Sequence, residues 1–471
     1  MVYTNPFSPD RSKLEKKLAD TIPTDPSSPT STRAIRAALQ IVQQLQDEGR
    51  ANIRQYEGED KRILTYLLLF AMYHRQLDEM EHHIERQAKT PDTILEFLPA
   101  RQAINWMIQW GFDKQQAYTF LALAFQLKRA HYFIGRTLVG DSNSMAKLRM
   151  GLWQNIFTND VRLYEDTLKD RMEDFSTLIL GQTGSGKGAV ASALGRSGFI
   201  PYDESSDRFS ENFASSFISI NLSQYPENLI ESELFGHKKG AFTGAIEKHQ
   251  GVFARSSSFG ALFLDEIGDA SLPVQCKLLQ VLQERVYSPV GSHVRERFNG
   301  RIIAATNKDI DKMRQNGEFR DDFYYRLCSD LIRVPTLHQR FEEAPDEQAQ
   351  MVRHVAQNIV GPGQPGVVES VVSKVNECVP ADYTWPGNVR ELEQCVRSIL
   401  LTERYIPQAV ASPKDLSDKL KHSIEAGNYT SQELVSDYCK LLHSRLGTYE
   451  AVAKKTGLDR RTVKKYIEQA S

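Results

Sequence analysis

The sequence lacks a long hydrophobic run. Its longest, Ile63–Met72, is interrupted by Thr65 and is about half of the ~20 residues that a membrane span needs. A basic and then apolar N-terminal segment, the mark of a signal peptide, is also missing. The five cysteines form no CxxC pair, which excludes the common zinc and dithiol motifs. Scattered cysteines are typical of a reducing compartment, so we expect a cytoplasmic protein with no membrane partner.

An excess of charge of one sign is absent as well. Lys and Arg number 58 and Asp and Glu number 60, which gives a formal net charge of -2. The chain therefore has no overall basic field for nucleic acid, and any DNA contact must be local. Residues 1–136 also lack the acidic cluster and strand-end Asp, in alternating strand–helix units, that a phosphoacceptor receiver needs.

Changes in composition and periodicity divide the chain into segments. In chain order these are a flexible arm (1–31), a helical domain of unknown type (32–136), an α/β subdomain (137–337), a helical subdomain (338–405), a linker (406–429) and a C-terminal helical segment (430–471). In the α/β subdomain each apolar run ends just before polar or glycine residues, as in a parallel sheet with its chemistry at the carboxyl ends. These predicted strands are Thr177–Leu180, Phe217–Ile220, Ala261–Leu264 and Arg301–Ala305.

Histidines and tryptophans of the helical domain receive structural interpretations. His74, His82 and His83 do not have a metal-ligand spacing, and we expect them on a solvated helix face. Trp106 and Trp110 lie one helical turn apart, which is typical of a core aromatic pair rather than a ligand cage.

The sharpest local motif is GQTGSGKG, residues 181–188, directly after the apolar run TLIL. This is the spacing of a P-loop, in which glycines let backbone N–H groups face phosphates at a helix N-terminus. A lysine there can reach the β- and γ-phosphates of ATP. A chance glycine-rich turn is the alternative, which the preceding strand disfavours. The predicted nucleotide-binding residues are Gly181, Gly184, Ser185, Gly186, Lys187 and Gly188.

Gly188 stands where most P-loops have a Mg²⁺-binding hydroxyl. Magnesium must then depend on phosphate oxygens, water and a carboxylate from elsewhere. The segment ALFLDEIG supplies one at a strand end. We predict that Asp265 holds Mg²⁺, directly or through water, and that Glu266 polarises the attacking water. A strand-capping acidic pair without catalytic use is the alternative.

The segment ESELFGHKKGAFTGA, residues 231–245, contains an intact GAFTGA. It resembles the hallmark of the bacterial enhancer-binding proteins, which are AAA+ ATPases that activate RNA polymerase carrying sigma-54. Their central domain is similar to residues ~138–405 here. Five further motifs match in the same order: the P-loop, the acidic pair, AATN (304–307), FRDDFYYRL (319–327) and WPGNVREL (385–392).

The resemblance implies a fold of several domains, with an α/β AAA+ P-loop core, a helical lid, an all-α N-terminal domain and a C-terminal DNA-binding module. In the family, GAFTGA forms the tip of a loop that touches sigma-54, where the aromatic residue supplies an apolar contact and the threonine a small polar one. The glycines permit a tight turn. The implied contact loop is Gly240, Ala241, Phe242, Thr243, Gly244 and Ala245.

The resemblance assigns roles to five further residues. Asn307 matches sensor I, which helps orient water at the γ-phosphate, and Asn221 matches the asparagine that pairs with the Walker B glutamate and reports nucleotide state to the loop. Arg320 and Arg326 match arginine fingers, which act in trans and imply a homo-oligomeric ring, most often a hexamer. Arg390 matches sensor II in the lid.

Two departures place the chain on a divergent branch of the family. Gly188 replaces the usual glutamate after the P-loop lysine, and the segment GFIPYDESSDRF, residues 198–209, is longer and more polar than expected. Both bear on nucleotide affinity and hydrolysis rate rather than on the fold.

Near the C-terminus, GTYEAVAKKTGLDRRTVKKYIEQA reads as a helix, a turn containing Gly457, and a second helix from near Asp459. This is the pattern of a helix-turn-helix, and it resembles the DNA-binding module of the same family. An ordinary charged helical hairpin is the alternative. The residues expected to contact bases and phosphates are Arg460, Arg461, Thr462, Lys464 and Lys465.

Together these features predict a sigma-54-dependent activator. It hydrolyses ATP to convert the closed promoter complex of sigma-54 RNA polymerase to the open one, while it is bound to upstream double-stranded DNA and regulated by residues 32–136. One rival is a DNA-binding regulator that binds ATP without remodelling polymerase, and ATP turnover separates it. A second is an AAA+ remodeller with another client, which sigma-54 binding separates.

Overall fold

The computed structural model describes residues 4–21, 27–242, 244–361, 363–380, 382–407, 420, 423–424, 427 and 429–468. Contacts between residues divide the chain into two compact units, residues 1–373 with 382–401, and residues 374–381 with 402–471. Each unit is described by itself.

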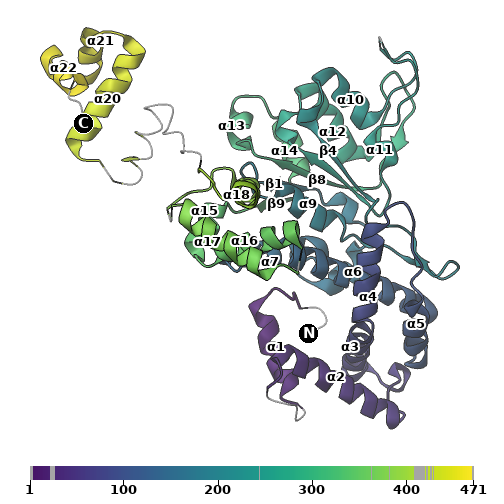
Figure 1. The fold of residues 1–471 in the computed structure, drawn as a ribbon. Coiled ribbons are helices and arrows are strands. Elements are labelled where there is room, and N and C mark those ends of the chain that lie inside the picture. Colours follow the sequence, from purple (N-terminus) through teal and green to yellow (C-terminus); the bar gives the residue numbers. More distant parts are fainter. Residues whose placement is uncertain are drawn as a thin grey trace. The chain divides into compact units, whose positions relative to one another are not determined.

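The N-terminal part of the first unit is helical, as predicted (Figure 1). Its elements are α1 (Pro9–Ala19), α2 (Thr30–Asp47), η1 (Ile53–Gln55), α3 (Gly58–Arg75), α4 (Leu77–Lys89), α5 (Pro99–Gln109) and α6 (Lys114–Thr137). The longest, α6, begins with a capping box, in which Asp113 and Gln116 each accept a hydrogen bond from the other's backbone N–H.

The expectation of a flexible arm over residues 1–31 is wrong for residues 9–19, which form α1. The Ser8 hydroxyl accepts a hydrogen bond from the Asp10 N–H, and Pro9 takes the first helical position, so this polar segment carries a helix start. The helix buries Ala19 and packs on α2. Ahead of it, Phe7 stacks on His131 of α6 at 5.6 Å between ring centroids.

The expected solvated histidine face is correct for His82, which is exposed, and wrong for His74 and His83. His83 is 5% exposed and packs against the rings of Phe97, Phe125 and Phe209. Burial lowers the pKa of His83 to about 4, and the charges of Arg86 and Arg129 lower it further. His74 is likewise shielded, in contact with the ring of Phe70.

The described residues contain a five-stranded parallel sheet in the order β4–β5–β8–β1–β9. The strands are β4 (Phe217–Asn221), β5 (Ala261–Asp265), β8 (Arg301–Thr306), β1 (Thr177–Leu180) and β9 (Asp330–Arg333). The first four contain the predicted segments. The edge strand β9 escaped prediction because only two apolar residues lie between its charged ends.

Strand residues alternate between two apolar clusters, as the pleat of a sheet requires. Leu178, Leu262 and Ala304 face one cluster, whereas Ile179, Phe263 and Ile303 face the other. The second cluster continues without a break through α9 and α6 into the N-terminal helices. The N-terminal helices therefore share a core with the sheet.

Helices, short turns and two hairpins precede and connect the strands (Figure 1). The helices and turns are α7 (Asn143–Phe157), α8 (Val161–Leu163), η2 (Tyr164–Leu168), η3 (Met172–Asp174), α9 (Lys187–Gly195), η4 (Leu222–Gln224), α10 (Glu227–Phe235), α11 (Val252–Arg255), η5 (Ile267–Asp269), α12 (Leu272–Glu284), α13 (Ile310–Gln315) and α14 (Asp321–Leu327). The hairpins are β2 (Tyr202–Asp203) with β3 (Arg208–Phe209), and β6 (Val286–Tyr287) with β7 (Glu296–Arg297).

The predicted helical lid follows. Its helices are α15 (Leu337–Glu343), α16 (Glu347–Val360), α17 (Pro365–Cys378) and α18 (Asn388–Thr402). A buried ion pair, 2.5 Å between Arg340 Nε and Glu347 Oε1, joins α15 to α16. The same two side chains hydrogen-bond the backbone of Val139 and Ser142, so they fasten the lid to the segment before α7.

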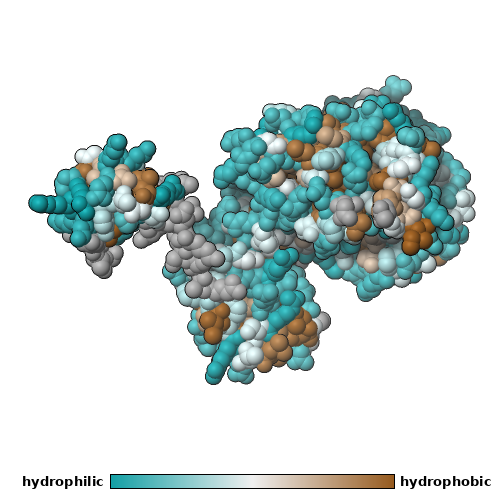
Figure 2. Space-filling view, turned by 90° about the horizontal axis from the view of Figure 1, so that it is seen from above, coloured by the Kyte–Doolittle hydropathy of each residue, from teal (hydrophilic) through white to brown (hydrophobic). Residues whose placement is uncertain are grey.

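The second unit contains α20 (Ser431–Leu446), α21 (Tyr449–Thr456) and α22 (Arg460–Glu468) around a small core of Cys439, Val452 and Val463. Hydrophilic residues cover most of the visible surface in Figure 2, and hydrophobic ones lie in separate patches. Among the described residues, no helix combines the length and the apolar character that crossing a bilayer requires.

Candidate nucleotide site and partner loop

The P-loop joins the end of β1 to the start of α9, as the sequence predicts. Gly184 and Gly186 have φ of +74° and +101°, a region that favours glycine. A Cβ at Gly184 would lie 2.3 Å from the carbonyl oxygen of Gly387, so the lid permits no side chain there. Ser185 is 5% exposed, and its hydroxyl has no hydrogen-bond partner among the described residues. At Gly188 an added Cβ meets nothing within 4 Å.

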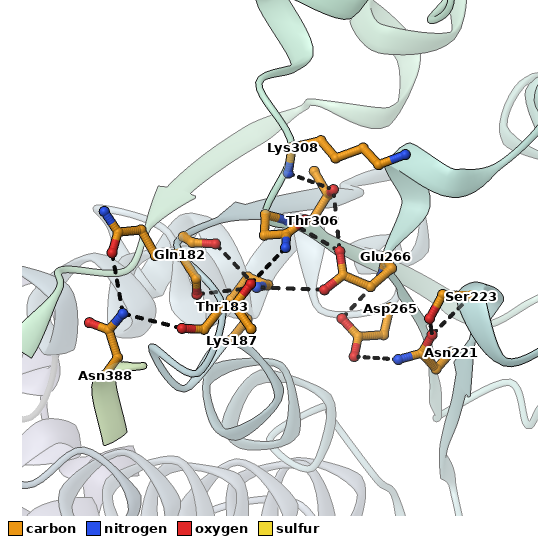
Figure 3. A network of polar contacts seen from close by, with 12 residues as sticks. Gln182, Thr183, Lys187, Asn221, Ser223, Asp265, Glu266, Thr306, Lys308 and Asn388 are labelled. Atoms are coloured by element: carbon orange, nitrogen blue, oxygen red, sulfur yellow. Dashed lines mark hydrogen bonds and ion pairs between the residues drawn. The ribbon is translucent and has the colours of Figure 1, made fainter. Parts of the chain in front are cut away.

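The structure brings three sequence-predicted groups together at the carboxyl edge of the sheet, and Figure 3 labels Lys187 and Glu266 among them. Lys187 Nζ lies 3.8 Å from Glu266 Oε1 and donates to the carbonyl oxygen of Gly181 at 3.1 Å. The backbone N–H of Asn307 donates to Glu266 Oε2 at 3.3 Å, and its side-chain amide donates to the Thr183 hydroxyl at 2.7 Å. A lysine, a carboxylate and an amide thus surround one point beside the P-loop.

Asp265 is the second carboxylate of this edge. Burial raises its pKa above the usual carboxyl value, the neighbouring Glu266 raises it further, and Lys187 and Arg390 oppose these effects. The Asn221 amide donates to Asp265 Oδ2 at 3.3 Å (Figure 3). The expected pairing of Asn221 with Glu266 is therefore not present here, since Asn221 contacts the aspartate and Glu266 faces Lys187 and Asn307.

The lid closes the site from the other side. The Asn388 amide donates to Gln182 Oε1 at 3.3 Å and to the carbonyl oxygen of Thr183 at 3.2 Å. Arg390 follows in the same helix, and its Cβ borders Gly184. A cavity of about 240 Å³ between P-loop and lid is lined by Leu138, Val139, Gly186, Ala189, Val355 and Arg397, among others. This concave, partly apolar space adjoins a phosphate-binding loop.

Arg320 and Arg326 lie outside this cluster. Arg320 Nη2 pairs with Asp322 Oδ2 at 2.7 Å, and Arg326 Nε donates to the carbonyl oxygen of Leu282 at 3.0 Å. Their hydrogen-bond partners belong to α12 and α14 rather than to the P-loop.

The GAFTGA loop leaves the end of α10. Its base is closed by two 3.0 Å backbone hydrogen bonds that His237 and His249 exchange. Above them Gly240 and Gly244 have φ of +81° and +104°, in open space. Phe242 is 37% exposed, with its ring 4.9 Å from that of His237. Ala241 and Ala245 flank it in the same turn, and Thr243 lies outside the described residues.

In the second unit, α21 and α22 are joined through Gly457, which has φ of +73°. Asp459 accepts hydrogen bonds from the backbone N–H groups of Arg461 and Thr462, which starts α22. The exposed residues of this helix are Arg460, Arg461, Lys464 and Lys465, and Thr462 is half-buried.

Sequence reasoning missed several residues of the site. Gln182 and Thr183 occupy the variable positions of the P-loop pattern, where no residue type is demanded. Asn388 adopts φ of +53°, and its Oδ1 accepts a hydrogen bond from the Leu337 N–H. Its place in WPGNVREL, two residues before Arg390, was the signal that could have found it.

A parallel sheet of this order, a P-loop after one of its strands, an acidic strand end and a helical lid define an AAA+ ATPase domain. Residues 159–333 match the sigma-54 interaction domain, and residues 366–433 match the AAA+ ATPase lid domain. The chain thus belongs to the family of AAA+ proteins that carry a sigma-54 interaction domain. The lid match also extends over the predicted linker, 406–429.

Three relatives show the extent of the likeness. The DNA-binding transcriptional regulator NtrC of Rhizobium meliloti is 37% identical over 66% of this chain and 61% of its own. Transcriptional regulatory protein GlrR of Escherichia coli is 37% identical over 64% of each chain. Regulatory protein AtoC of Escherichia coli is 37% identical over 68% of this chain and 66% of its own. The chain spans less than two thirds of the length of the first two.

Proposed function

We propose that this protein is a cytoplasmic, sigma-54-dependent transcription activator. It hydrolyses ATP to convert the closed complex of sigma-54 RNA polymerase at a promoter to the open complex. The observation that carries this proposal is the exposed Phe242 of the GAFTGA loop, which follows α10, a helix that η4 connects to Asn221 beside Asp265.

The residues around the P-loop fit ATP with Mg²⁺. Backbone N–H groups and Lys187 suit the phosphates, and the shielded Ser185 hydroxyl has a vacant hydrogen-bonding capacity beside them. Asp265 is the carboxylate available to Mg²⁺, because Gly188 supplies no hydroxyl. Glu266 polarises the attacking water, Asn307 orients it, and Arg390 couples the lid to the nucleotide. The cavity lined by Leu138 and Val139 suits the base and ribose.

A short chain of contacts leads from the nucleotide site to the loop. Asn221 contacts Asp265 and also accepts hydrogen bonds from the N–H and hydroxyl of Ser223 in η4. The helix α10 follows η4, and the GAFTGA loop follows α10. Loss of the γ-phosphate changes the electrostatic environment of the two carboxylates, and a shift of Asn221 moves the start of α10 and hence Phe242.

Two parts of the proposal involve other molecules. Arg320 and Arg326, which do not contact their own P-loop, reach the nucleotide of a neighbouring subunit in a homo-oligomeric ring, a hexamer, and stabilise charge on the transferred phosphoryl group. The helices α21 and α22 form a helix-turn-helix that binds upstream double-stranded DNA, where Arg460, Arg461, Thr462, Lys464 and Lys465 contact bases and phosphates.

Transcription from a sigma-54 promoter by purified components tests the proposal. The intact protein is compared with Phe242→Ala, and ATP turnover is measured in the same samples. We expect open complexes with the intact protein, and their loss in the variant while turnover continues.

Each other outcome removes one part of the proposal. Binding of ATP without turnover would favour the DNA-binding regulator that does not remodel polymerase. Turnover without binding of sigma-54 would indicate an AAA+ remodeller with another client. Turnover with sigma-54 binding but without open complexes would contradict activation.

A further inference from the structure

The N-terminal helices enclose a cavity of about 380 Å³ next to the ATPase core. It lies between α1, α2, α3, α6 and α7, and its apolar lining includes Leu69, Phe70, Phe120, Leu123, Leu127 and Phe157. A volume of this size is within the range of small-molecule sites, and close packing normally leaves only much smaller voids inside a domain.

Two polar side chains in the lining are left unsatisfied. Both ring nitrogens of His74 and the indole nitrogen of Trp153 lack a hydrogen-bond partner among the described residues. All three atoms are shielded from solvent. Trp110 and Trp385 also have unpartnered indole nitrogens, so one such atom decides nothing. What distinguishes this place is that an indole donor and an imidazole, which offers one donor and one acceptor, belong to two residues that line the same cavity.

Two basic side chains at the cavity are paired, and the lining also includes Glu165. Arg11 Nε pairs with Glu15 Oε1 at 2.7 Å, and Lys128 Nζ pairs with Glu81 Oε2 at 2.5 Å. Burial lowers the pKa of His74 to about 4, with Arg11 and Lys128 lowering it further, so its ring is neutral at pH 7. An anionic ligand would find both basic side chains already paired, whereas an uncharged ligand avoids the cost of desolvating a charge.

We propose that the cavity is a binding site for a small uncharged molecule that is mostly aromatic or aliphatic and carries a hydroxyl or carbonyl group. The apolar lining receives its hydrocarbon part. A rotation of Trp153 or His74 toward the ligand brings its nitrogen to the cavity surface. There the hydroxyl or carbonyl accepts a hydrogen bond from it, and a hydroxyl also donates to the second nitrogen of the imidazole.

The cavity has a direct structural connection to the P-loop helix. One side of α6 lines it with Phe120, Ala124 and Leu127. The other side binds the end of α9, because Arg129 donates to the carbonyl oxygens of Arg196 and Gly198, at 2.8 and 2.6 Å. Occupancy that moves α6 therefore reaches α9. This consequence rests on the proposed ATPase function, whereas binding itself does not.

Calorimetric titration of the full chain with three matched probes tests the site: 2-naphthol, naphthalene and 2-naphthoate. We expect saturable binding of one 2-naphthol per chain, weaker binding of naphthalene, and none of the charged 2-naphthoate. His74→Phe and Trp153→Phe should each weaken 2-naphthol about tenfold, the effect of one hydrogen bond, and leave naphthalene unchanged. Ala124→Met and Leu127→Trp should abolish binding of both by filling the cavity, whereas Thr119→Met, on the same helix outside the lining, should not.

The titration can overturn the proposal in three ways. Absence of saturable binding of both uncharged probes to the intact protein would exclude a ligand site. Binding that survives both filling variants would place the probe elsewhere. Tighter binding of 2-naphthoate than of 2-naphthol would contradict an uncharged ligand. Circular dichroism selects the variants that fold, and either filling variant alone suffices. Because no step measures ATP turnover, failure here is distinct from failure of the proposed ATPase function.

Discussion

Two segments that interrupt the ATPase subdomain have opposite surroundings. The GAFTGA loop carries an aromatic residue, Phe242, that is 37% exposed. A Cβ added at the nearby Gly240 or Gly244 would meet nothing within 4 Å. The β2–β3 hairpin, in the segment that looked too long and too polar, ends in Phe209, which is 2% exposed and stacks on Phe125 of α6 at 3.9 Å. The ring of Phe242 is accessible at the surface, whereas the ring of Phe209 is buried within the chain.

The hairpin shows what the extra segment accomplishes. The N–H of Phe97 donates to the carbonyl oxygen of Asp207 at 2.8 Å, and Arg101 pairs with the Asp207 carboxylate. The Asn212 amide donates to the carbonyl oxygens of Thr90, Pro91 and Thr93. The polar residues of this segment therefore join the ATPase subdomain to the N-terminal helices. The hairpin fixes them in place, whereas the loop keeps its tip accessible.

The largest expected effect comes from removing the buried aromatic residue. Phe209→Ala should lower the free energy of unfolding of the N-terminal helices by about 3–5 kcal/mol, since it leaves a cavity among Phe97, Phe125 and His83. Urea unfolding followed by amide exchange in α4 and α6 measures it. A change below about 1 kcal/mol, the usual range for surface sites, would contradict the assignment of the hairpin as an anchor.

The same contact predicts a pH dependence. The folded pKa of His83 is about 4 against 6.5 for the free side chain, so the unfolded chain binds more protons between these values. Stability is therefore lost as pH falls from 6.5 to 4, by about 3 kcal/mol for this group.

His83→Phe should remove that part of the pH dependence, and His82→Phe, at the exposed neighbouring position, should retain it. The measurement is the urea midpoint of α4 exchange at pH 6.5 and at pH 4.5. If the urea midpoint changes equally between pH 6.5 and pH 4.5 in the two variants, the low folded pKa of His83 is contradicted.

The sequence predicted the nucleotide site and the exposed loop far better than the interface. P-loop, acidic strand end and GAFTGA are contiguous motifs, in which spacing alone places the functional atoms. The contact between the β2–β3 hairpin and the N-terminal helices combines His83, Phe97, Phe125 and Phe209 from separate segments. No local sequence motif marks any of these four residues. The polarity of residues 198–209 was equally hard to interpret from the sequence. Asp207 pairs with Arg101, which lies more than a hundred positions away.

The third effect concerns the contact behind the hairpin. Arg129 is fully buried, and burial lowers the pKa of its guanidinium to about 9. Arg129→Met should cost about 1–3 kcal/mol, because the carbonyl groups of Arg196 and Gly198 lose their donors. Arg136→Met, an exposed arginine on the same helix, is the control. Faster amide exchange at the end of α9 in the first variant only would establish the link between α6 and the P-loop helix. Equal amide exchange at the end of α9 in the two variants would contradict this link.

The smallest effect is expected at the accessible aromatic residue and completes the contrast. Phe242→Ala removes a ring whose main described neighbour is His237, in a turn where Gly240 and Gly244 have nothing within 4 Å of an added Cβ. The free energy of unfolding should change by less than about 0.5 kcal/mol, as at other surface positions. Urea unfolding beside Phe209→Ala compares the two directly. A loss as large as that of Phe209→Ala would mean that the ring supports the fold, and a transcription defect in the same variant could then not be assigned to a lost partner contact. A Phe242→Ala variant that is stable but does not activate transcription would support a role of this exposed aromatic ring in contact with a partner.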